Sequence, residues 1–178
     1  MKTANTTIAR PADDEYAPYY GKYIVQVEGD DVLPHLVSQI ERTWQMLSTL
    51  DEARAAHRYA PGKWSVKQVV GHMSDVERVF TYRALRISRA DETPLPGFDE
   101  NAYVDNATFD DRAIEDLALE FRAVRSATIA LFASLPEPVL TRRGTASGNP
   151  FSVRSFAWIC AGHELHHRKL LVERYGLS

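Results

Sequence analysis

Three histidines stand where helical periodicity would bring their imidazoles together. His163 and His167 are four residues apart in a segment with apolar residues at the same helical spacing, so both fall on one buried helix face. His72 lies at the edge of an apolar stripe in an earlier segment. Three neutral imidazoles with one coordination position left for water form the layout of a catalytic zinc-type site. The spacing therefore predicts a mononuclear metal site inside the protein.

The alternative is that the three histidines are buried separately, each with its own hydrogen-bond partner. For a single core histidine this interpretation would be preferred. It is weaker for a pair on one apolar face, because buried polar groups need partners and neighbouring imidazoles repel each other when protonated. His166 points to another face of the same helix, so we expect it to be exposed or to contact the site only from outside.

Residues 163–167 also match the H-E-x-x-H signature of zinc peptidases, in which two histidines bind zinc and the glutamate activates water. Such a peptidase needs a third ligand further along the chain. Only Glu173 carries a carboxylate there, and it lies too close to His167 on the same helix. A ferritin-like di-metal site needs a second E-x-x-H pair, which the sequence lacks. The third ligand is therefore expected from upstream.

Four segments with helical periodicity must position these histidines, and no segment of comparable length alternates like a strand. They span about residues 31–50, 65–89, 110–135 and 152–175. Ser65 and Gln68 form an S-x-x-Q capping box at the start of the second. Gly176 is placed to cap the end of the fourth. Four amphipathic helices of about 20 residues predict an all-α four-helix bundle.

The remaining residues form an N-terminal arm and two long connections. The arm covers residues 1–29. Its tyrosines are expected to pack on the bundle: Tyr16, Tyr19, Tyr20 and Tyr23. The connection over residues 90–109 is longer than bundle loops usually are, so we expect a functional loop or a crossover. The connection over residues 136–150 is expected to form a hairpin or a lid.

Length, composition and charge are typical of one soluble domain. The 178 residues are 44% hydrophobic and 25% charged, close to globular averages, and predict a single domain over residues 1–178. A net charge of -3 argues against nucleic acid as a partner. The longest hydrophobic run, residues 156–161, is far too short to cross a membrane, and residues 1–16 lack the apolar stretch of a secretory signal. We expect a cytoplasmic protein.

Two histidine-bearing segments carry a resemblance to a known family. They are WSVKQVVGHMSDVERVF, residues 64–80, and SFAWICAGHELHHRKLL, residues 155–171. Both resemble the DinB-like (YfiT-like) superfamily of metal-dependent four-helix-bundle enzymes, and the arm sequence EYAPYYGKYI, residues 15–24, is similar to the YfiT-like branch. By position, the resemblance implies that the metal ligands are His72, His163 and His167.

The resemblance further implies a homodimer and a divalent metal ion, commonly zinc or nickel. Characterised members include thiol transferases and isomerases that use a low-molecular-weight thiol, such as bacillithiol or mycothiol, as co-substrate. A metal on three neutral imidazoles lowers the pKa of bound water toward about 7, or turns a bound thiol into a thiolate. We therefore predict an enzyme acting on a small-molecule substrate, either a hydrolase or a thiol-S-transferase. The alternative is a non-catalytic metal-binding or stress-associated protein in which the ion only braces the bundle.

Three further residues close to the predicted ligands in sequence are candidates for roles in the site. Glu164 is adjacent to His163 and is a candidate catalytic base, although an ion-pairing role accounts for it equally. Asp75, three residues after His72, is a candidate to orient that imidazole by a hydrogen bond, and a solvated helix face also accounts for it. Cys160 is interpreted as a small buried hydrophobe rather than as a ligand or nucleophile.

Overall fold

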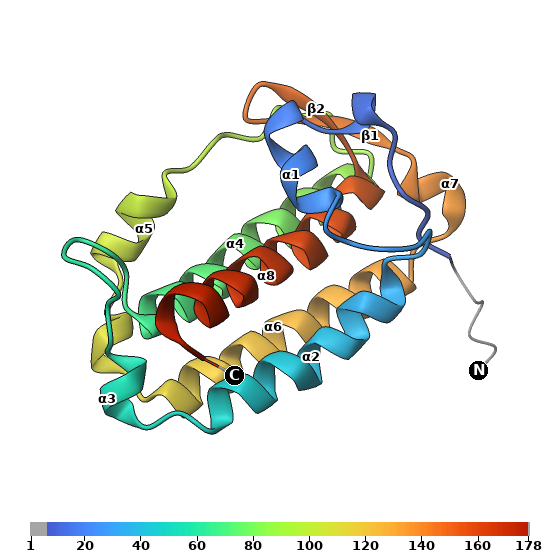
Figure 1. Cartoon of the computed structure of the whole chain (residues 1–178). Coiled ribbons are helices and arrows are strands. Elements are labelled where there is room, and N and C mark those ends of the chain that lie inside the picture. Colours follow the sequence, from blue (N-terminus) through green and yellow to red (C-terminus); the bar gives the residue numbers. More distant parts are fainter. Residues whose placement is uncertain (1–6, 178) are drawn as a thin grey trace.

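The computed structural model describes residues 7–177, and four long helices dominate it (Figure 1). They are α2 (Leu33–Ser48), α4 (Val66–Ser88), α6 (Ile114–Ala133) and α8 (Val153–Tyr175). The all-α four-helix bundle predicted from periodicity is confirmed. Helix α6 begins later than predicted, because residues Phe109–Asp111 form a separate 3-10 turn, η3. No helix in the described part of the chain has the length and apolar character needed to cross a bilayer.

The helices pack around the bundle in the order α2, α6, α4, α8. Helices α4 and α6 run in the same direction, as do α2 and α8, whereas α4 and α8 are antiparallel (Figure 1). A connection between two parallel neighbours has to return along the whole bundle. The segment between α4 and α6 does so, and it carries the short helix α5 (Glu100–Asn106) and η3. The connection over residues 90–109 was expected to be a functional loop or a crossover, and the structure shows a crossover.

The capping signals lie where they were predicted. Ser65 Oγ accepts a hydrogen bond from the Gln68 N–H (3.0 Å), and the Ser65 N–H donates to Gln68 Oε1 (3.1 Å), so α4 begins with a complete capping box. Helix α8 begins after Ser152, whose hydroxyl accepts from the Ser155 N–H. It ends at Gly176 with φ 67°, a left-handed conformation that favours glycine. These caps fix the beginning of α4 and both ends of α8, the two helices that carry the three histidines.

The connection between α6 and α8 contains the predicted hairpin. A short helix, α7 (Glu137–Leu140), precedes strands β1 (Arg143–Ala146) and β2 (Asn149–Ser152), which pair antiparallel. The Leu95 N–H of the crossover donates to Thr145 O (2.9 Å). The hairpin and the crossover are therefore joined at one end of the bundle.

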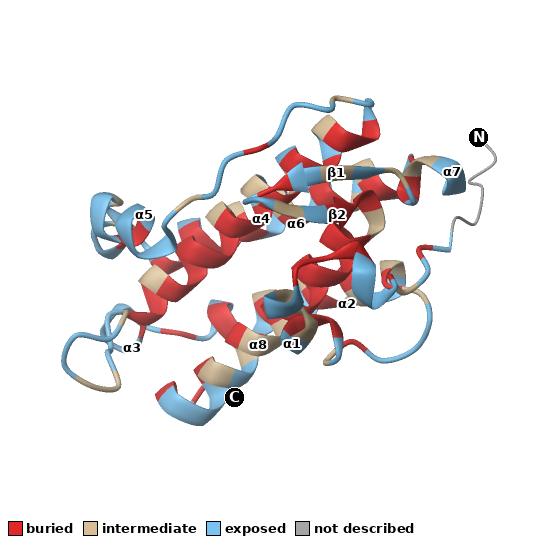
Figure 2. Cartoon of the chain, turned by 90° about the horizontal axis from the view of Figure 1, so that it is seen from above, coloured by how far each residue is buried: buried red, intermediate tan, exposed pale blue. Residues whose placement is uncertain are grey.

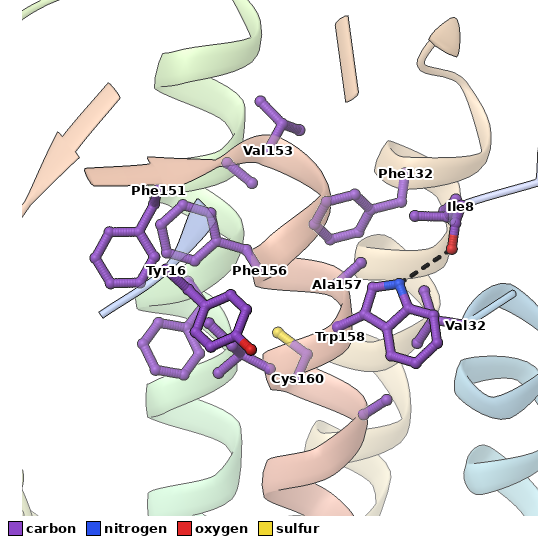
Figure 3. Packing of buried hydrophobic residues seen from close by; sticks show 14 of the residues in the cluster. Ile8, Tyr16, Val32, Phe132, Phe151, Val153, Phe156, Ala157, Trp158 and Cys160 are labelled. Carbon is purple, nitrogen blue, oxygen red and sulfur yellow. Dashed lines mark hydrogen bonds between the residues drawn. The ribbon is translucent and has the colours of Figure 1, made fainter. Parts of the chain in front are cut away.

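Helix α8 is buried on all sides from Ser155 to Glu164 and α4 over most of its surface, while α5 and the hairpin turn are largely exposed (Figure 2). At one end of the core the fully buried Trp158 lies close to Phe132 and Ala157 (Figure 3). Its indole N–H donates to Ile8 O (3.0 Å) and Ala9 O (3.1 Å) of the arm. The core of the bundle therefore continues into the arm.

The arm packs on α8, and its first six residues lie outside the described part of the chain. It contains two 3-10 turns, η1 (Asp13–Glu15) and η2 (Pro18–Tyr20), and the short helix α1 (Gly21–Ile24). Tyr16 and Tyr23 are buried and Tyr20 is half-buried, as expected. Tyr19 is 56% exposed, which corrects the expectation for that residue. The Lys22 ammonium lies 3.6 Å from the centroid of its ring, and the ring stands edge-on to Tyr20 and Tyr23.

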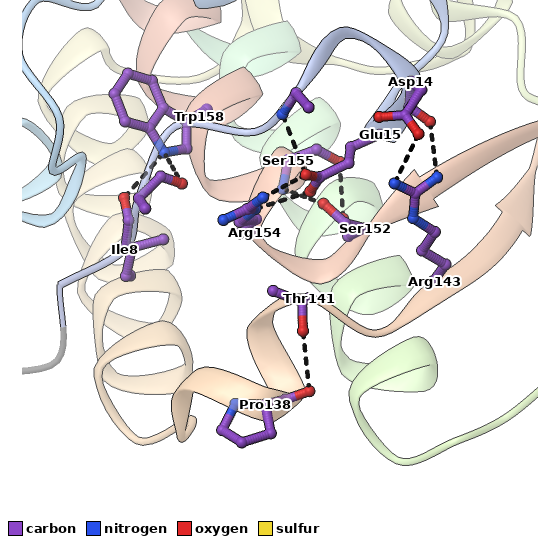
Figure 4. Close-up of polar contacts among 12 residues, drawn as sticks. Ile8, Asp14, Glu15, Pro138, Thr141, Arg143, Ser152, Arg154, Ser155 and Trp158 are labelled. Atoms are coloured by element: carbon purple, nitrogen blue, oxygen red, sulfur yellow. Dashed lines mark hydrogen bonds and ion pairs between the residues drawn. The ribbon is translucent and has the colours of Figure 1, made fainter.

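Two ion pairs join the arm to the bundle, and they differ in burial (Figure 4). Arg154 makes a bidentate pair with Glu15, which is 4% exposed, with 2.8 Å between Arg154 Nε and Glu15 Oε2. Arg143 pairs with Asp14 at 2.9 Å, and the Asp14 side chain is 71% exposed. Burial alone would raise the pKa of Glu15, but hydrogen bonds from Arg154, Ser152 and the Ala12 N–H outweigh burial and lower it to about 2.

Replacing Glu15 should therefore weaken arm docking in a pH-dependent way. The pKa of Glu15 is about 2 in the folded protein, against an ordinary value of 4.5, so the pair stabilises the fold fully above pH 4.5 and loses this effect as pH falls toward 2. Glu15→Gln should lower the free energy of unfolding at pH 7 by about 1–3 kcal/mol, measured by urea denaturation. The difference from wild type should shrink below pH 4.5.

Asp14→Asn is the matched control, since it removes the exposed pair of the same arm. It should change the free energy of unfolding by less than about 1 kcal/mol. If both substitutions lowered the free energy of unfolding equally at pH 7, burial would not be what makes the Glu15 pair stronger than the Asp14 pair.

Candidate metal centre

Helices α4 and α8 bring His72, His163 and His167 together inside the bundle. Nε2 of His163 lies 3.2 Å from Nε2 of His72 and 3.0 Å from Nε2 of His167. One ring nitrogen from each residue lies within 4.8 Å of the other two, and the three residues are 4%, 6% and 7% exposed. Because α4 and α8 are antiparallel, the beginning of α4 faces the later turns of α8. The convergence expected from spacing is present, and the role of these residues as ligands stays a prediction.

Burial keeps the three imidazoles neutral. It lowers the pKa of His72 to about 4. Burial also lowers the pKa values of His163 and His167 well below the ordinary 6.5, and the neighbouring imidazoles lower them further. At pH 7 each ring therefore has a lone pair available for a cation.

A shared cation would satisfy the three ring nitrogens better than hydrogen bonds among the rings can. Nε2 of His163 either donates one hydrogen bond or accepts one, so it cannot satisfy both neighbouring Nε2 atoms. A cation bound by three lone pairs satisfies all of them. Nitrogen ligands of a tetrahedral zinc ion lie about 3.3 Å apart for bonds of about 2.0–2.1 Å. The two distances from His163, 3.0 and 3.2 Å, are close to this value, and the His72 and His167 nitrogens lie within 4.8 Å of each other. Among residues 7–177, no carboxylate or thiol completes this group as a fourth ligand.

Aromatic rings surround the cluster. The Trp64 ring centroid lies 4.7 Å from that of His72, and the Tyr23 ring stands edge-on to His163 at 5.3 Å. Tyr23 also contacts the half-buried His166 at 5.4 Å, so His166 touches the surroundings of the site without joining the three nitrogens. These rings shield the imidazoles from bulk water.

Two glycines allow other segments to approach directly beside the histidines. A Cβ atom on Gly162 would lie 2.1 Å from the Tyr23 carbonyl oxygen, and one on Gly71 would lie 2.4 Å from the Phe109 ring. Gly162 therefore lets α1 lie against α8 next to His163. The sequence analysis did not use either residue, although a glycine inside a predicted helix often has a packing reason.

Glu164 does not face the three imidazoles. It follows His163 by one residue, and a helix turns by about 100° per residue, so its side chain points toward α2. The Thr43 hydroxyl donates to Glu164 Oε1, and Arg168 Nη1 lies 3.6 Å from the same oxygen. Burial raises the pKa of Glu164, and its Oε2 is buried without a hydrogen-bond partner. The structure places the candidate base in an ion-pairing environment.

Asp75 and Cys160 also lie apart from the cluster. Asp75 pairs with Arg78 at 3.2 Å near the surface, and no hydrogen bond joins it to His72 in the described structure. Burial, with a smaller contribution from Glu77, raises the pKa of the Cys160 thiol well above its usual value. Cys160 is therefore protonated and packed as a small hydrophobe, as the sequence analysis expected.

A buried ion pair that the sequence analysis missed lies beside the cluster. Arg125 of α6 is fully buried and binds both carboxylate oxygens of Glu77 in α4, at 2.7 and 2.8 Å. Its Nη1 donates to Gln39 of α2, and its Nη2 donates to the Cys160 carbonyl of α8 at 3.4 Å. Gln39 Nε2 donates to the Ala161 carbonyl at 2.9 Å. The guanidinium of Arg125 thus joins α6 to the other three helices. Its contact with α8, at Cys160, lies less than one turn before His163.

A cavity of about 70 Å³ opens beside His163. Its wall comes from the arm, α4, the crossover, the hairpin turn and α8. It is lined by Tyr19, Tyr20, Tyr23, Val76, Phe80, Phe98, Glu100, Ser147 and His163. Glu100 is the carboxylate on this wall, and the sequence analysis gave no signal for it because α5 lies far from the histidines in sequence.

Comparisons with known proteins agree with the four-helix-bundle fold. A family model described as the DinB superfamily matches residues 35–171. No functionally curated protein gave a significant sequence match. The chain is similar to YfiT from Bacillus subtilis, described as a probable metal-dependent hydrolase with an unusual four-helix bundle topology, with TM-score 0.70 and 19% identity over 94% of each chain.

Two further solved structures share the fold. The mycothiol-dependent maleylpyruvate isomerase has TM-score 0.64 and 14% identity, over 78% of this chain and 59% of that one. A DinB-like protein from Bacillus cereus ATCC 10987 has TM-score 0.59 and 20% identity, over 83% of this chain and 92% of that one. At these identities the likeness shows the fold alone.

The contact at Gly162 predicts a strong effect of one methyl group. In Gly162→Ala the new Cβ would meet the backbone of Tyr23, which has to move away from α8. We expect the free energy of unfolding to fall by about 1–3 kcal/mol, measured by urea denaturation. Gly21→Ala is the control, because its Cβ would meet only the Tyr16 ring at an ordinary 3.7 Å. A neutral Gly162→Ala would show that α1 does not pack on α8 as described.

Proposed function

This chain belongs to the DinB superfamily, and from that premise we propose that it is a metal-dependent enzyme acting on a small molecule. One observation carries the proposal: three buried, neutral imidazoles converge on one point beside a cavity. A purely structural ion needs a closed set of ligands. The described residues supply no fourth ligand, which favours an enzyme over a non-catalytic metal-binding or stress-associated protein.

The residues of the site have separate tasks in this proposal. His72, His163 and His167 would hold the ion through their Nε2 atoms. A bound divalent ion such as zinc or nickel would lower the pKa of a coordinated water or thiol, so that either becomes a nucleophile near pH 7. Trp64 and Tyr23 exclude bulk water from the imidazoles.

Two reactions fit this site, and similar structures exist for both. YfiT is described as a probable metal-dependent hydrolase, and the maleylpyruvate isomerase depends on mycothiol. We therefore propose either hydrolysis or the transfer of a low-molecular-weight thiol to an electrophile. A small-molecule substrate, a cytoplasmic location and a homodimer belong to the same proposal.

Glu100 has a different expected role in the two reactions, so its substitution can distinguish hydrolysis from thiol transfer. Water is a weak acid, so its attack benefits from a carboxylate that accepts its proton, and Glu100 is the carboxylate lining the cavity. A thiol that coordinates the ion would be deprotonated by the metal itself and needs no such base. Glu164 is unsuited to this task, because its carboxylate points toward α2.

The metal content of histidine variants tests the ligand assignment. Untagged protein purified without chelators should contain about one zinc, nickel or similar ion per chain, as expected for one site with three ligands. His72→Ala and His163→Ala should each lose the ion and stay helical, by elemental analysis and circular dichroism. The exposed His57 provides the control, and His57→Ala should keep the ion. Retention of the ion by both site variants would overturn the assignment.

Glu100→Gln tests which reaction occurs. If the protein is a hydrolase, hydrolysis of 4-nitrophenyl acetate by the metal-loaded protein should fall about 100-fold or more in kcat. If it is a thiol transferase, conjugation of cysteine to 1-chloro-2,4-dinitrobenzene should be metal-dependent and keep its kcat. Asp105→Asn is the control, since Asp105 is exposed on the same short helix and does not line the cavity. Metal-loaded protein inactive in both assays would favour the non-catalytic alternative.

A further inference from the structure

The Tyr23 hydroxyl is a polar group of a buried side chain, and it lies open to the cavity beside His163. Tyr23 is 6% exposed and lines that cavity. No protein carbonyl or carboxylate in residues 7–177 accepts a hydrogen bond from its hydroxyl. The fully enclosed polar atoms without a partner in this part of the chain are Arg83 Nη1, Glu164 Oε2 and His167 Nδ1. The Tyr23 oxygen is not one of them, so it keeps surface that a small molecule in the cavity can reach.

The phenol of Tyr23 is a hydrogen-bond donor in a fixed position. Phenols have an ordinary pKa of about 10 and carry their proton at pH 7. The hydroxyl of Tyr19 lies nearby, but Tyr19 is 56% exposed, and water can satisfy it instead. The Tyr23 ring stands edge-on to His163 at 5.3 Å, and its backbone lies against Gly162. These contacts fix the direction of the hydroxyl relative to the histidines.

The rest of the wall favours a small neutral acceptor as the ligand. Hydroxyl groups on it can donate to an oxygen, and they belong to Tyr19, Tyr20, Tyr23 and Ser147. The carboxylate of Glu100 disfavours an anion in the cavity. A cation is disfavoured by the buried Arg83 guanidinium, which donates to Ser147 Oγ at 3.0 Å. The cavity of about 70 Å³ admits a group of a few atoms, and a carbonyl meets all of these conditions.

We propose that Tyr23 is a catalytic residue whose hydroxyl donates a hydrogen bond to a carbonyl oxygen of the substrate. When water or a thiol beside His163 attacks the carbonyl carbon, the electron pair of the C=O bond moves onto this oxygen. A donor that is already in place stabilises the developing charge, and the phenol keeps its proton. The inference rests on the proposed function, because that function places the nucleophile beside His163, and it names carbonyl compounds as the substrate class.

The chain offers a closely matched pair of variants. Tyr23→Phe keeps the ring and its contacts and removes only the hydroxyl. Tyr16→Phe is the control, since Tyr16 is a buried tyrosine of the same arm that does not line the cavity. Its hydroxyl donates to Asp13 Oδ1 at 2.8 Å.

The first measurement is an NMR titration of metal-free protein with acetone and with isopropylammonium, which carries an ammonium group in place of the carbonyl oxygen. Acetone should shift the backbone amides of Tyr23, Phe80 and Ser147 and bind more tightly than isopropylammonium. Tyr23→Phe should weaken acetone binding about threefold or more, as expected for one lost hydrogen bond, and Tyr16→Phe should leave it unchanged.

The second measurement is hydrolysis of 4-nitrophenyl acetate by the metal-loaded protein. Tyr23→Phe should lower kcat about 100-fold and change KM little, because the contact strengthens as charge develops on the oxygen. Tyr16→Phe should keep the kcat of the wild type.

The proposal would be overturned if acetone caused no shift of these amides, or if Tyr23→Phe bound acetone as well as the wild type. Tighter binding of isopropylammonium would replace the carbonyl site with a cation site. An active enzyme whose kcat is unaffected by Tyr23→Phe would remove the catalytic role and leave the proposed function intact. Acetone binding through Tyr23 in a protein that takes up no metal would keep the carbonyl site and remove the metal-dependent enzyme.

Discussion

The bidentate pair between Arg125 and Glu77 is the interaction on which the arrangement of the four helices depends. The guanidinium is fully buried and contacts α4, α2 and the backbone of α8 from its own position on α6. Removing one partner of such a pair typically costs about 3–5 kcal/mol, because it leaves an uncompensated charge in the interior. Its contact with α8 falls at Cys160, less than one turn before His163, so it also sets where the histidines lie relative to α4.

Features that depend on local spacing were predictable from the sequence, and features that depend on long-range packing were not. The helices, the capping box at Ser65 and the common face of His163 and His167 follow from periodicity within one segment. Arg125 and Glu77 were missed, because a charged residue beside an apolar stripe has the same local pattern whether it is solvated or paired with a distant helix. The direction of Glu164 was open for a similar reason, since only the packing of α2 against α8 shows that Thr43 is its neighbour.

The four long helices and the remaining segments contribute different parts of the site. The helices supply the histidines and the buried network that holds them. The arm, the crossover and the hairpin turn supply most of the cavity wall. Gly162 links the two parts, because it allows α1 and Tyr23 to lie against the histidine-bearing helix. The cavity wall can therefore change through these outer segments while the imidazoles keep their positions.

The parallel pairing of α4 with α6 has a consequence for how the chain folds. In a bundle of sequential antiparallel hairpins, most contacts are local in sequence and folding is fast. Here the neighbours of α2 are α6 and α8, and the contact between His72 and His163 closes a separation of 91 residues. Contacts this distant must overcome loop-closure entropy before they contribute, so this chain should cross its folding barrier more slowly than an up-and-down bundle of equal length. In the unfolded chain an ion would meet at most the neighbouring pair in α8, and the complete set of three nitrogens exists only after the crossover has closed.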